Sequence, residues 1–216
     1  MIPRSRYDEY LAALLRGERS TCADIVRHLL AAEVTVRTLY TGLFQPALYQ
    51  VGELWETNQV SVATEHLATA ITEGLLHLVY PLLFSGPRVG KSAVISCAPN
   101  EYHQLGGKMV ADCFELLGWR GYFLGANTPV QDLIAFVQAR QPDAVALSLA
   151  VYFNLPALLE AATAIRSEFP RLPVVVGGQA FRAGGRGRVE QVPGVCHLAS
   201  LDELEFWIQS TFSHGV

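Results

Sequence analysis

The stretch SAVISCAPNEYHQLGGKMVADCFELL, residues 92–117, decides the fold of this chain. It begins with a run of apolar and small residues, continues through a polar loop that contains a histidine, and ends in a segment with helical periodicity. We predict a buried strand over Ser92–Ala98 and a helix over Gly106–Leu117. In a chain of alternating strands and helices, a loop that follows a strand lies at the carboxyl edge of the sheet, where such folds bind ligands.

The same alternation continues toward the C-terminus. Further strands are predicted over Trp119–Leu124, Ala144–Leu149 and Pro173–Val176, and further helices over Pro129–Arg140 and Pro156–Phe169. Strands separated by helices pair in parallel, with the helices covering both faces of the sheet. We therefore predict a Rossmann-like (flavodoxin-like), doubly wound parallel sheet over residues 92–216.

The N-terminal part of the chain is helical throughout. Apolar residues recur at helical spacing over residues 5–16, 20–32, 34–55 and 61–84, with turn signals at Gly17 and Thr57–Gln59. Gly42 and Pro46 are expected to kink or divide the third segment. Four amphipathic helices with short connections predict a four-helix bundle over residues 1–84, followed by the linker SGPRVGK over 85–91. The predicted fold class is α/β with an α-helical cap.

Composition excludes several classes of protein. Half of the residues are apolar and 17% are charged, which is typical of a globular protein and not of a disordered one. The net charge of −4 provides no general attraction to nucleic acid. The four cysteines are scattered without a C-x-x-C pair, which favours a reducing cytoplasm over disulfides or a zinc site. No secretory signal or membrane span is expected, so we predict a cytoplasmic protein.

The loop after the first predicted strand carries the strongest functional signal. An exposed imidazole at a strand end can ligate a metal, and a nearby carboxylate can hold its other ring nitrogen and set the tautomer. His103 and Glu101 fit these two roles. Gly106 and Gly107 allow a bulky group to approach the backbone closely. The alternative is an ordinary polar loop with a glycine at the start of a helix.

The loops after the other predicted strands are also rich in residues that ligand sites use. Leu124–Pro129 contains Gly, Asn and Thr, Ser148 lies at the end of the third strand with Tyr152 just beyond, and Gly177–Phe181 begins with two glycines. Each loop alone is a weak signal because strand ends often carry such residues. Together they place four candidate loops at one edge of the sheet.

Taken in chain order, Glu101-x-His103-x-x-Gly106, Leu147-Ser148-Leu149 and Gly177-Gly178 resemble the cobalamin-binding domain of corrinoid proteins. The resemblance implies that His103 ligates cobalt from below in place of the cofactor's own dimethylbenzimidazole, and that Glu101 steers it. It also implies that the displaced nucleotide tail runs along the serine loop and the double glycine. The implied cofactor contacts in this domain are Glu101, Tyr102, His103, Leu105, Gly106, Thr128, Ser148, Leu149, Tyr152, Gly177, Gly178, Gln179, Ala180 and Phe181.

The helical half carries a second pattern, a tryptophan ten residues before a Glu-His pair. Trp55, Glu65 and His66 resemble the upper-face cap of CarH-type light-sensing cobalamin photoreceptors. In that family the tryptophan stacks on the adenosyl group and the glutamate hydrogen-bonds to it. The structural alternative is a core tryptophan with two solvent-facing polar residues. One departure stands at Glu56, where the best-known relatives carry a histidine that captures cobalt after illumination; His66 or His77 are the candidates to replace it.

The resemblance implies a standalone cobalamin-binding photoreceptor, which is a regulator and not an enzyme. Adenosylcobalamin is the favoured form, with methylcobalamin or hydroxocobalamin as alternatives. The family's N-terminal winged helix is not expected, since residues 1–30 are too short for it. We therefore expect no direct binding of nucleic acid or membrane, and an output through a protein partner or homo-oligomer.

Two other functions remain open from the sequence. One is a methyl-carrying corrinoid protein of a methyltransferase system, and the other is a haem-binding sensor with His103 as the iron ligand. His66, Glu73 and His77 share a helical face and form a further candidate metal site. Gly86–Ser92 imitates a phosphate-binding loop, but it has three residues between its glycines instead of four and precedes a strand, so we discard it.

Overall fold

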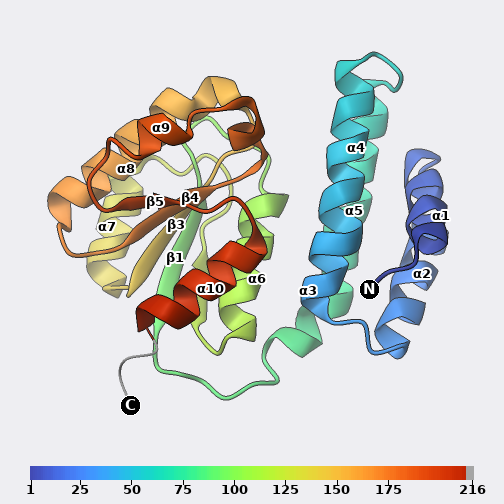
Figure 1. Ribbon diagram of the computed structural model, residues 1–216, viewed down its shortest axis with the longest axis horizontal. Helices are drawn as coiled ribbons and strands as arrows, with labels where there is room; N and C mark the ends of the chain where they lie inside the picture. The colour runs from blue at the N-terminus through green and yellow to red at the C-terminus, as the bar shows by residue number, and fades with distance from the viewer. Residues whose placement is uncertain (213–216) are drawn as a thin grey trace. The chain divides into compact units, whose positions relative to one another are not determined.

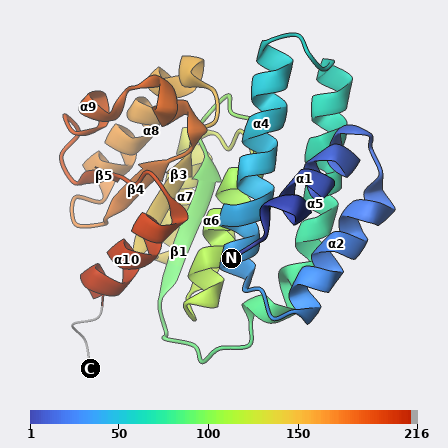
Figure 2. The same ribbon diagram turned by 45° about the vertical axis from the view of Figure 1, so that its right-hand side comes forward.

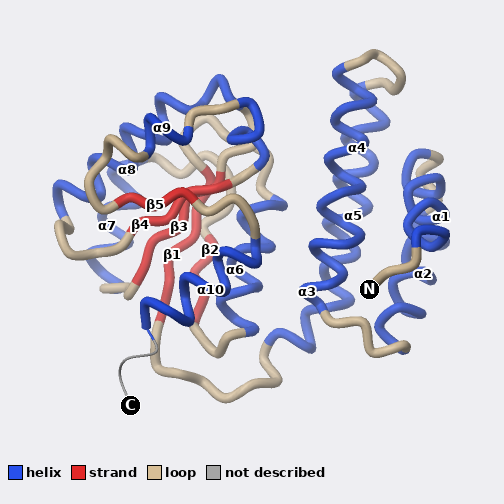
Figure 3. Tube along the Cα trace, viewed as in Figure 1, coloured by secondary structure: helices blue, strands red, loops and turns tan. Residues whose placement is uncertain are grey.

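The computed structural model describes residues 1–212, so His214 and the last residues of the predicted sheet domain lie outside the described part. The chain divides into two compact units, one over Met1–Ser85 and the other from Gly86 onward. The first unit is helical, and the second contains the sheet (Figures 1 and 3).

The first unit contains the four predicted helical segments. Its elements are α1 (Arg4–Leu15), α2 (Arg19–Ala31), α3 (Val36–Leu39), the π-helical turn η1 (Tyr40–Phe44), α4 (Gln45–Glu56) and α5 (Val62–Leu83). Tyr10, Tyr40 and Phe44 are fully buried and form the aromatic centre of its core. The Tyr10 hydroxyl lies 3.4 Å from the Thr72 hydroxyl, which gives both buried polar groups a partner.

The predicted division of the third segment takes the form of the π-helical turn. Pro46 has no backbone N–H, so the carbonyl of Gly42, four residues earlier, cannot receive an ordinary helical hydrogen bond from it. The Gln45 amide instead donates to the carbonyl of Tyr40, five residues earlier. The wider turn accommodates the proline, and α4 continues from it.

A short turn joins α4 to α5. Asn58 adopts a left-handed backbone conformation, and the Gln59 amide donates to the Leu54 carbonyl at 2.8 Å, which closes the end of α4. The Ser61 hydroxyl accepts from the Thr64 amide at 3.1 Å and caps the start of α5. The last turn of α4 and the first turn of α5 therefore lie at the same end of this helical hairpin (Figure 2).

The second unit is a parallel sheet in the order β2-β1-β3-β4-β5. Its strands are β1 (Ser92–Cys97), β2 (Arg120–Phe123), β3 (Ala144–Ser148), β4 (Val174–Gly177) and β5 (Val195–His197). This is the strand order of flavodoxin-like folds, so the predicted fold class is confirmed. The four predicted strands are present. β5 was not predicted from the sequence, because it has only three residues and none of them is fully buried.

Helices cover both faces of this sheet. They are α6 (Leu105–Leu116), α7 (Val130–Arg140), α8 (Leu155–Glu168), the short α9 (Arg186–Val189) and α10 (Leu201–Phe212), with 3-10 turns η2 (Tyr152–Asn154) and η3 (Gln179–Ala183). α6 and α10 lie on one face, and α7 and α8 on the other (Figure 1). The central strands β1, β3 and β4 are buried between these layers. None of the helices within residues 1–212 combines the length and apolar composition needed to cross a membrane.

The segment predicted as a linker is partly packed against the second unit. The Val89 amide donates to the Gly118 carbonyl at 3.0 Å, and the guanidinium of Arg88 contacts both the Glu115 carboxylate and the Trp119 carbonyl. Gly118 has a φ of +78°, and a Cβ there would lie 2.2 Å from the Pro87 carbonyl oxygen. The chain is thus fixed to the second unit several residues before β1 begins.

Candidate functional site

The candidate site lies where the loops after β1 and β3 meet. β1 and β3 are neighbours in the sheet, with Cys97 paired to Ser148 at their ends. The chain leaves β1 toward β2 on one side, whereas β3 leads to β4 on the other, so these strands form the topological switch point of the sheet. Ligands of doubly wound sheets bind at such points. The predicted loop Asn100–Gln104 is therefore at the expected edge.

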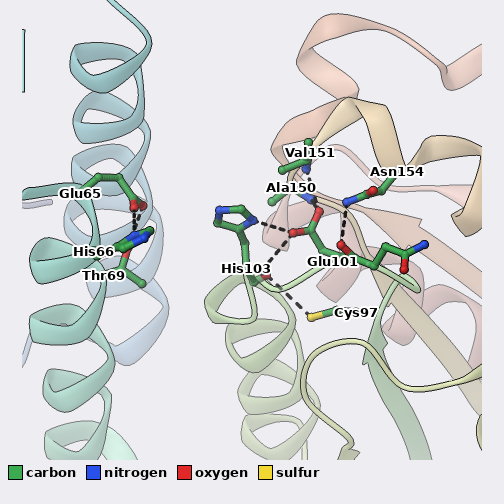
Figure 4. A network of polar contacts seen from close by, with 10 residues as sticks. Glu65, His66, Thr69, Cys97, Glu101, His103, Ala150, Val151 and Asn154 are labelled. Carbon is green, nitrogen blue, oxygen red and sulfur yellow. Dashed lines mark hydrogen bonds and ion pairs between the residues drawn. The ribbon is translucent and has the colours of Figure 1, made fainter. Parts of the chain in front are cut away.

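Glu101 is the centre of this site. Its side chain is completely buried, and its oxygen Oε1 accepts hydrogen bonds from the His103 ring nitrogen Nδ1 at 2.6 Å and from the His103 amide at 3.0 Å. The other oxygen, Oε2, accepts from the backbone amides of Ala150 at 3.0 Å and Val151 at 2.8 Å. The carboxylate thus lies between the imidazole and the loop after β3 (Figure 4).

These contacts decide the ionisation of Glu101. Burial by itself raises the pKa of a carboxyl group, but the hydrogen bonds from His103, Val151 and Ala150 outweigh it and lower the pKa of Glu101 from 4.5 to about 2. The group is a carboxylate at neutral pH and can only accept hydrogen bonds. Nδ1 of His103 must therefore carry a proton, which leaves the lone pair of the neutral ring on Nε2. Half of the His103 side chain is exposed.

Two asparagine side chains, those of Asn127 and Asn154, hold the loop that carries this pair. The side-chain oxygen of Asn127 accepts from the Asn100 amide at 2.9 Å, and its NH₂ group donates to the Tyr102 hydroxyl at 3.2 Å. The Asn154 NH₂ group donates to the Asn100 carbonyl at 3.1 Å. Asn127 lies in a loop that the sequence marked as a candidate, but neither Asn127 nor Asn154 was predicted to hold the loop after β1. The available signal was the residue type, because asparagine in a loop tolerates a left-handed conformation better than most residues, and Asn100 and Asn127 both adopt one.

The glycines after the histidine have a packing role. A Cβ on Gly107 would lie 3.1 Å from the Phe123 ring and 3.4 Å from the Ser148 Cβ, so glycine lets the start of α6 approach the ends of β2 and β3. A Cβ on Gly106 would lie 3.4 Å from the Ser148 hydroxyl oxygen. Ser148 itself is almost completely buried. The structure therefore brings the predicted serine and the predicted glycine loop together.

The double glycine after β4 is likewise required by the protein's own backbone. Gly178 has a φ of +122°, and a Cβ there would lie 2.1 Å from the Leu149 carbonyl oxygen. A Cβ on Gly177 would lie 2.7 Å from the Leu198 carbonyl oxygen. The close approach predicted from the sequence is thus present between neighbouring loops, and contact of these glycines with a ligand stays a prediction.

The remaining predicted contact residues of this unit differ in their exposure. Tyr102, Tyr152 and Gln179 are exposed, Thr128 and Phe181 are half-buried, and Leu105, Leu149 and Ala180 are buried. The side chains of Leu149 and Ala180 belong to the hydrophobic core below the edge. A ligand could meet these two residues only through their backbone.

The helical unit holds the second predicted group. The Trp55 side chain, in the last turn of α4, is 46% exposed, which excludes a core tryptophan. Glu65, in the first turn of α5, accepts hydrogen bonds from the Thr69 hydroxyl at 3.0 Å and pairs with Nδ1 of His66 at 2.7 Å (Figure 4). Glu56 is exposed. Trp55 and Glu65 thus lie at the same end of the α4–α5 hairpin.

The alternative metal site in this helix is wrong. Nδ1 of His77 donates to the Gly74 carbonyl within its own helix at 3.2 Å. Within residues 1–212, no three His, Cys, Asp or Glu side chains lie close enough together to hold a metal ion. Helical spacing put His66, Glu73 and His77 on one face, but their side chains do not converge.

Comparison with known proteins identifies the family. A sequence profile of the B12 binding domain matches residues 91–198, and a second B12 binding domain profile matches residues 6–80. The chain belongs to the B12-binding domain family. Each half of this B12-binding protein matches a B12 binding domain profile. The family predicted from the loop motifs is confirmed.

Curated relatives of this B12-binding protein are transcriptional regulators. The chain is 32% identical over 178 residues to the HTH-type transcriptional repressor CarH of Myxococcus xanthus, covering 82% of the chain and 58% of the relative. It is 36% identical over 184 residues to the repressor CarA of the same organism, covering 83% of the chain and 59% of the relative. The chain thus spans about three fifths of the length of these relatives.

Solved structures with the same fold include a corrinoid protein and a cobalamin-binding protein. The Methanosarcina barkeri monomethylamine corrinoid protein matches 97% of the chain and 99% of its own length, with a TM-score of 0.85 and 12% identity. A cobalamin-binding protein from Desulfitobacterium hafniense DCB-2 matches 93% of the chain and 96% of its own length, with a TM-score of 0.51 and 17% identity. At these identities the similarity establishes the fold.

The donor chemistry of the site fits a B12 cofactor. A neutral imidazole with its lone pair on Nε2 is a suitable axial ligand for the cobalt of a corrin ring. The Glu101 carboxylate on Nδ1 is the kind of outer partner that orients a ligating histidine and raises its basicity. His103 is thus chemically suited to hold the cobalt.

Proposed function

We propose that this B12-binding protein is a cobalamin-dependent light sensor, with adenosylcobalamin as its preferred cofactor and His103 as the lower axial ligand. The observation that carries the proposal is the pairing of His103 with the buried Glu101 carboxylate at the switch point of the sheet. The similarity to the CarH and CarA repressors supports a regulatory role. When adenosylcobalamin is bound, it supplies a cobalt–carbon bond that blue-green light cleaves.

The helical unit contributes the groups that distinguish this function. The exposed Trp55 offers an aromatic face on which an adenine can stack, and such stacking is worth roughly 1–3 kcal/mol. Glu65 is held by Thr69 and His66, so its carboxylate is oriented to accept hydrogen bonds from ribose hydroxyls. A methyl group offers neither an aromatic surface nor donors. We therefore propose that Trp55, Glu65 and His66 bind the upper face of adenosylcobalamin.

The remaining proposed contacts lie around His103. Tyr102 and Tyr152 present exposed rings in the loops after β1 and β3, and Thr128 and Gln179 lie in the loops after β2 and β4. Gly177, Gly178 and the buried Ser148 line the edge along which the nucleotide tail is proposed to run. We propose that light changes the association of the chain with itself or with a regulatory protein partner.

Absorption spectroscopy tests this function directly. The full chain is loaded in the dark with adenosylcobalamin or methylcobalamin, and spectra and size-exclusion profiles are recorded before and after green illumination. The proposal expects base-off, histidine-ligated spectra, tighter binding of the adenosyl form, and a change in association after illumination. Equal affinity for both forms, together with transfer of the methyl group to a thiol, would show that the methyl-carrying corrinoid function is correct. Binding of haem in place of cobalamin would show a haem sensor.

A further inference from the structure

The loop after β3 is attached at both of its ends to the loop after β1. At its start, the amides of Ala150 and Val151 donate to Oε2 of Glu101 at 3.0 and 2.8 Å. At its end, the Asn154 side chain donates to the Asn100 carbonyl at 3.1 Å. Between these attachments lie Tyr152 and Phe153, which are 44% and 88% exposed. The exposed Tyr152 and Phe153 thus lie in a segment whose two ends are hydrogen-bonded to the loop after β1.

Each oxygen of Glu101 serves one of these two loops. Oε1 accepts from the ring and the amide of His103, and Oε2 accepts from the two amides of the β3 loop. Four donors meet the roughly four lone-pair positions of a carboxylate, so its hydrogen-bonding capacity is used in full. Because the side chain is completely buried, a donor that moves away leaves a carboxylate oxygen poorly satisfied.

We infer that Glu101 is a positioning residue that couples the imidazole of His103 to the loop Ala150–Asn154. The two oxygens of a carboxylate are fixed relative to each other. If the imidazole moves and the carboxylate rotates to keep its hydrogen bond with Nδ1, Oε2 is displaced from the amides of Ala150 and Val151. A displacement of the imidazole therefore reaches Tyr152 and Phe153. The inference rests on the proposed function for one point, that a change in cobalt ligation moves the imidazole. The coupling between the imidazole and the loop can be measured in the chain without cofactor.

The length and charge of this side chain are both needed. Aspartate is shorter by one carbon–carbon bond, about 1.5 Å, so it can keep the contacts with His103 in its own loop but not those with the β3 loop. Glutamine has the right length, but it has only one oxygen acceptor. Its NH₂ group would therefore meet either the donors of His103 or the amides of the β3 loop, and could not accept a hydrogen bond from them. Glu101→Asp and Glu101→Gln consequently interrupt the coupling in different ways.

The test measures amide exchange and imidazole tautomers by NMR in the full, ligand-free chain at neutral pH. In Glu101→Asp, the amides of Ala150 and Val151 should exchange at least about tenfold faster, while the ¹⁵N shifts of His103 still report a proton on Nδ1. In His103→Phe, which removes the ring donor, protection of the same two amides should also fall severalfold. Chymotrypsin cleavage after Tyr152 or Phe153 should accelerate in both variants.

Asn154→Ala is the matched control. It releases the far end of the loop and should increase cleavage, while the tautomer of His103 stays unchanged. Unaltered protection of Ala150 and Val151 in His103→Phe would overturn the inference, because the imidazole and the loop would then be independent. Amide shifts of β1 and β3 verify that each variant is folded. Failure of the proposed function would instead appear as absent cobalamin binding in the wild-type chain, a separate measurement.

Discussion

Replacing Glu101 by glutamine should destabilise the second unit in a pH-dependent manner. The pKa of Glu101 is lowered from 4.5 to about 2 in the folded chain. This difference corresponds to about 3 kcal/mol of folding free energy, an upper value because denatured chains retain some structure. A carboxyl group whose pKa is lower in the folded state stabilises the fold above pH 4.5, and this contribution is lost as the pH falls toward 2.

The expected gap between wild type and Glu101→Gln can be worked out for each pH. At pH 7 the full gap of about 3 kcal/mol should appear, and at pH 3 it should shrink to about 1.4 kcal/mol, if glutamine behaves as the neutral acid does. Urea unfolding measured by tryptophan fluorescence is a suitable assay. A Trp55→Phe background leaves Trp119 and Trp207, which both lie in the second unit, as the probes.

Glu168→Gln, at an exposed position at the end of α8, controls for the loss of one negative charge. It should change the free energy of unfolding by less than about 0.5 kcal/mol. A gap for Glu101→Gln below 1 kcal/mol at pH 7, or one that stays constant down to pH 3, would refute the argument. Either result would mean that the hydrogen bonds of this carboxylate do not stabilise its ionised form.

Three further outcomes are expected. His103→Ala should lose the histidine-ligated cobalamin spectrum and bind cobalamin more weakly in an absorbance titration; an unchanged spectrum would remove His103 as the axial ligand. Trp55→Ala should weaken adenosylcobalamin binding roughly 5- to 150-fold with little effect on methylcobalamin, whereas Trp207→Ala, on α10, should leave both affinities unchanged. Gly178→Ala should destabilise the second unit by about 2 kcal/mol or more in urea unfolding, since its φ and the Leu149 carbonyl both oppose a side chain. Gly187→Ala, where a Cβ meets nothing within 4 Å, should be nearly neutral, and equal effects at both positions would contradict the packing argument.

Much of the fold could be predicted from the sequence because its signals are local. The apolar runs of β1, β3 and β4 and the helical periodicity between them follow from burial on both faces of a parallel sheet. The strand β5 was not predicted because its three partly exposed residues do not form an apolar run. The form of the helix interruption at Pro46 was also not predicted. A missing N–H predicts an interruption, but not that a π-helical turn accommodates it.

The candidate site divides in the same way. The sequence by itself determined that Glu101 and His103 follow a buried strand and that a carboxylate can hold an imidazole two residues away. Only the tertiary structure decided that the same carboxylate also binds the amides of Ala150 and Val151, some fifty residues further along the chain. Every residue except proline has a backbone N–H. The type of a residue therefore does not show whether its amide will donate to a distant carboxylate. The pairing of Cys97 with Ser148 in adjacent parallel strands brings the two loops together, and that register is a property of the assembled sheet.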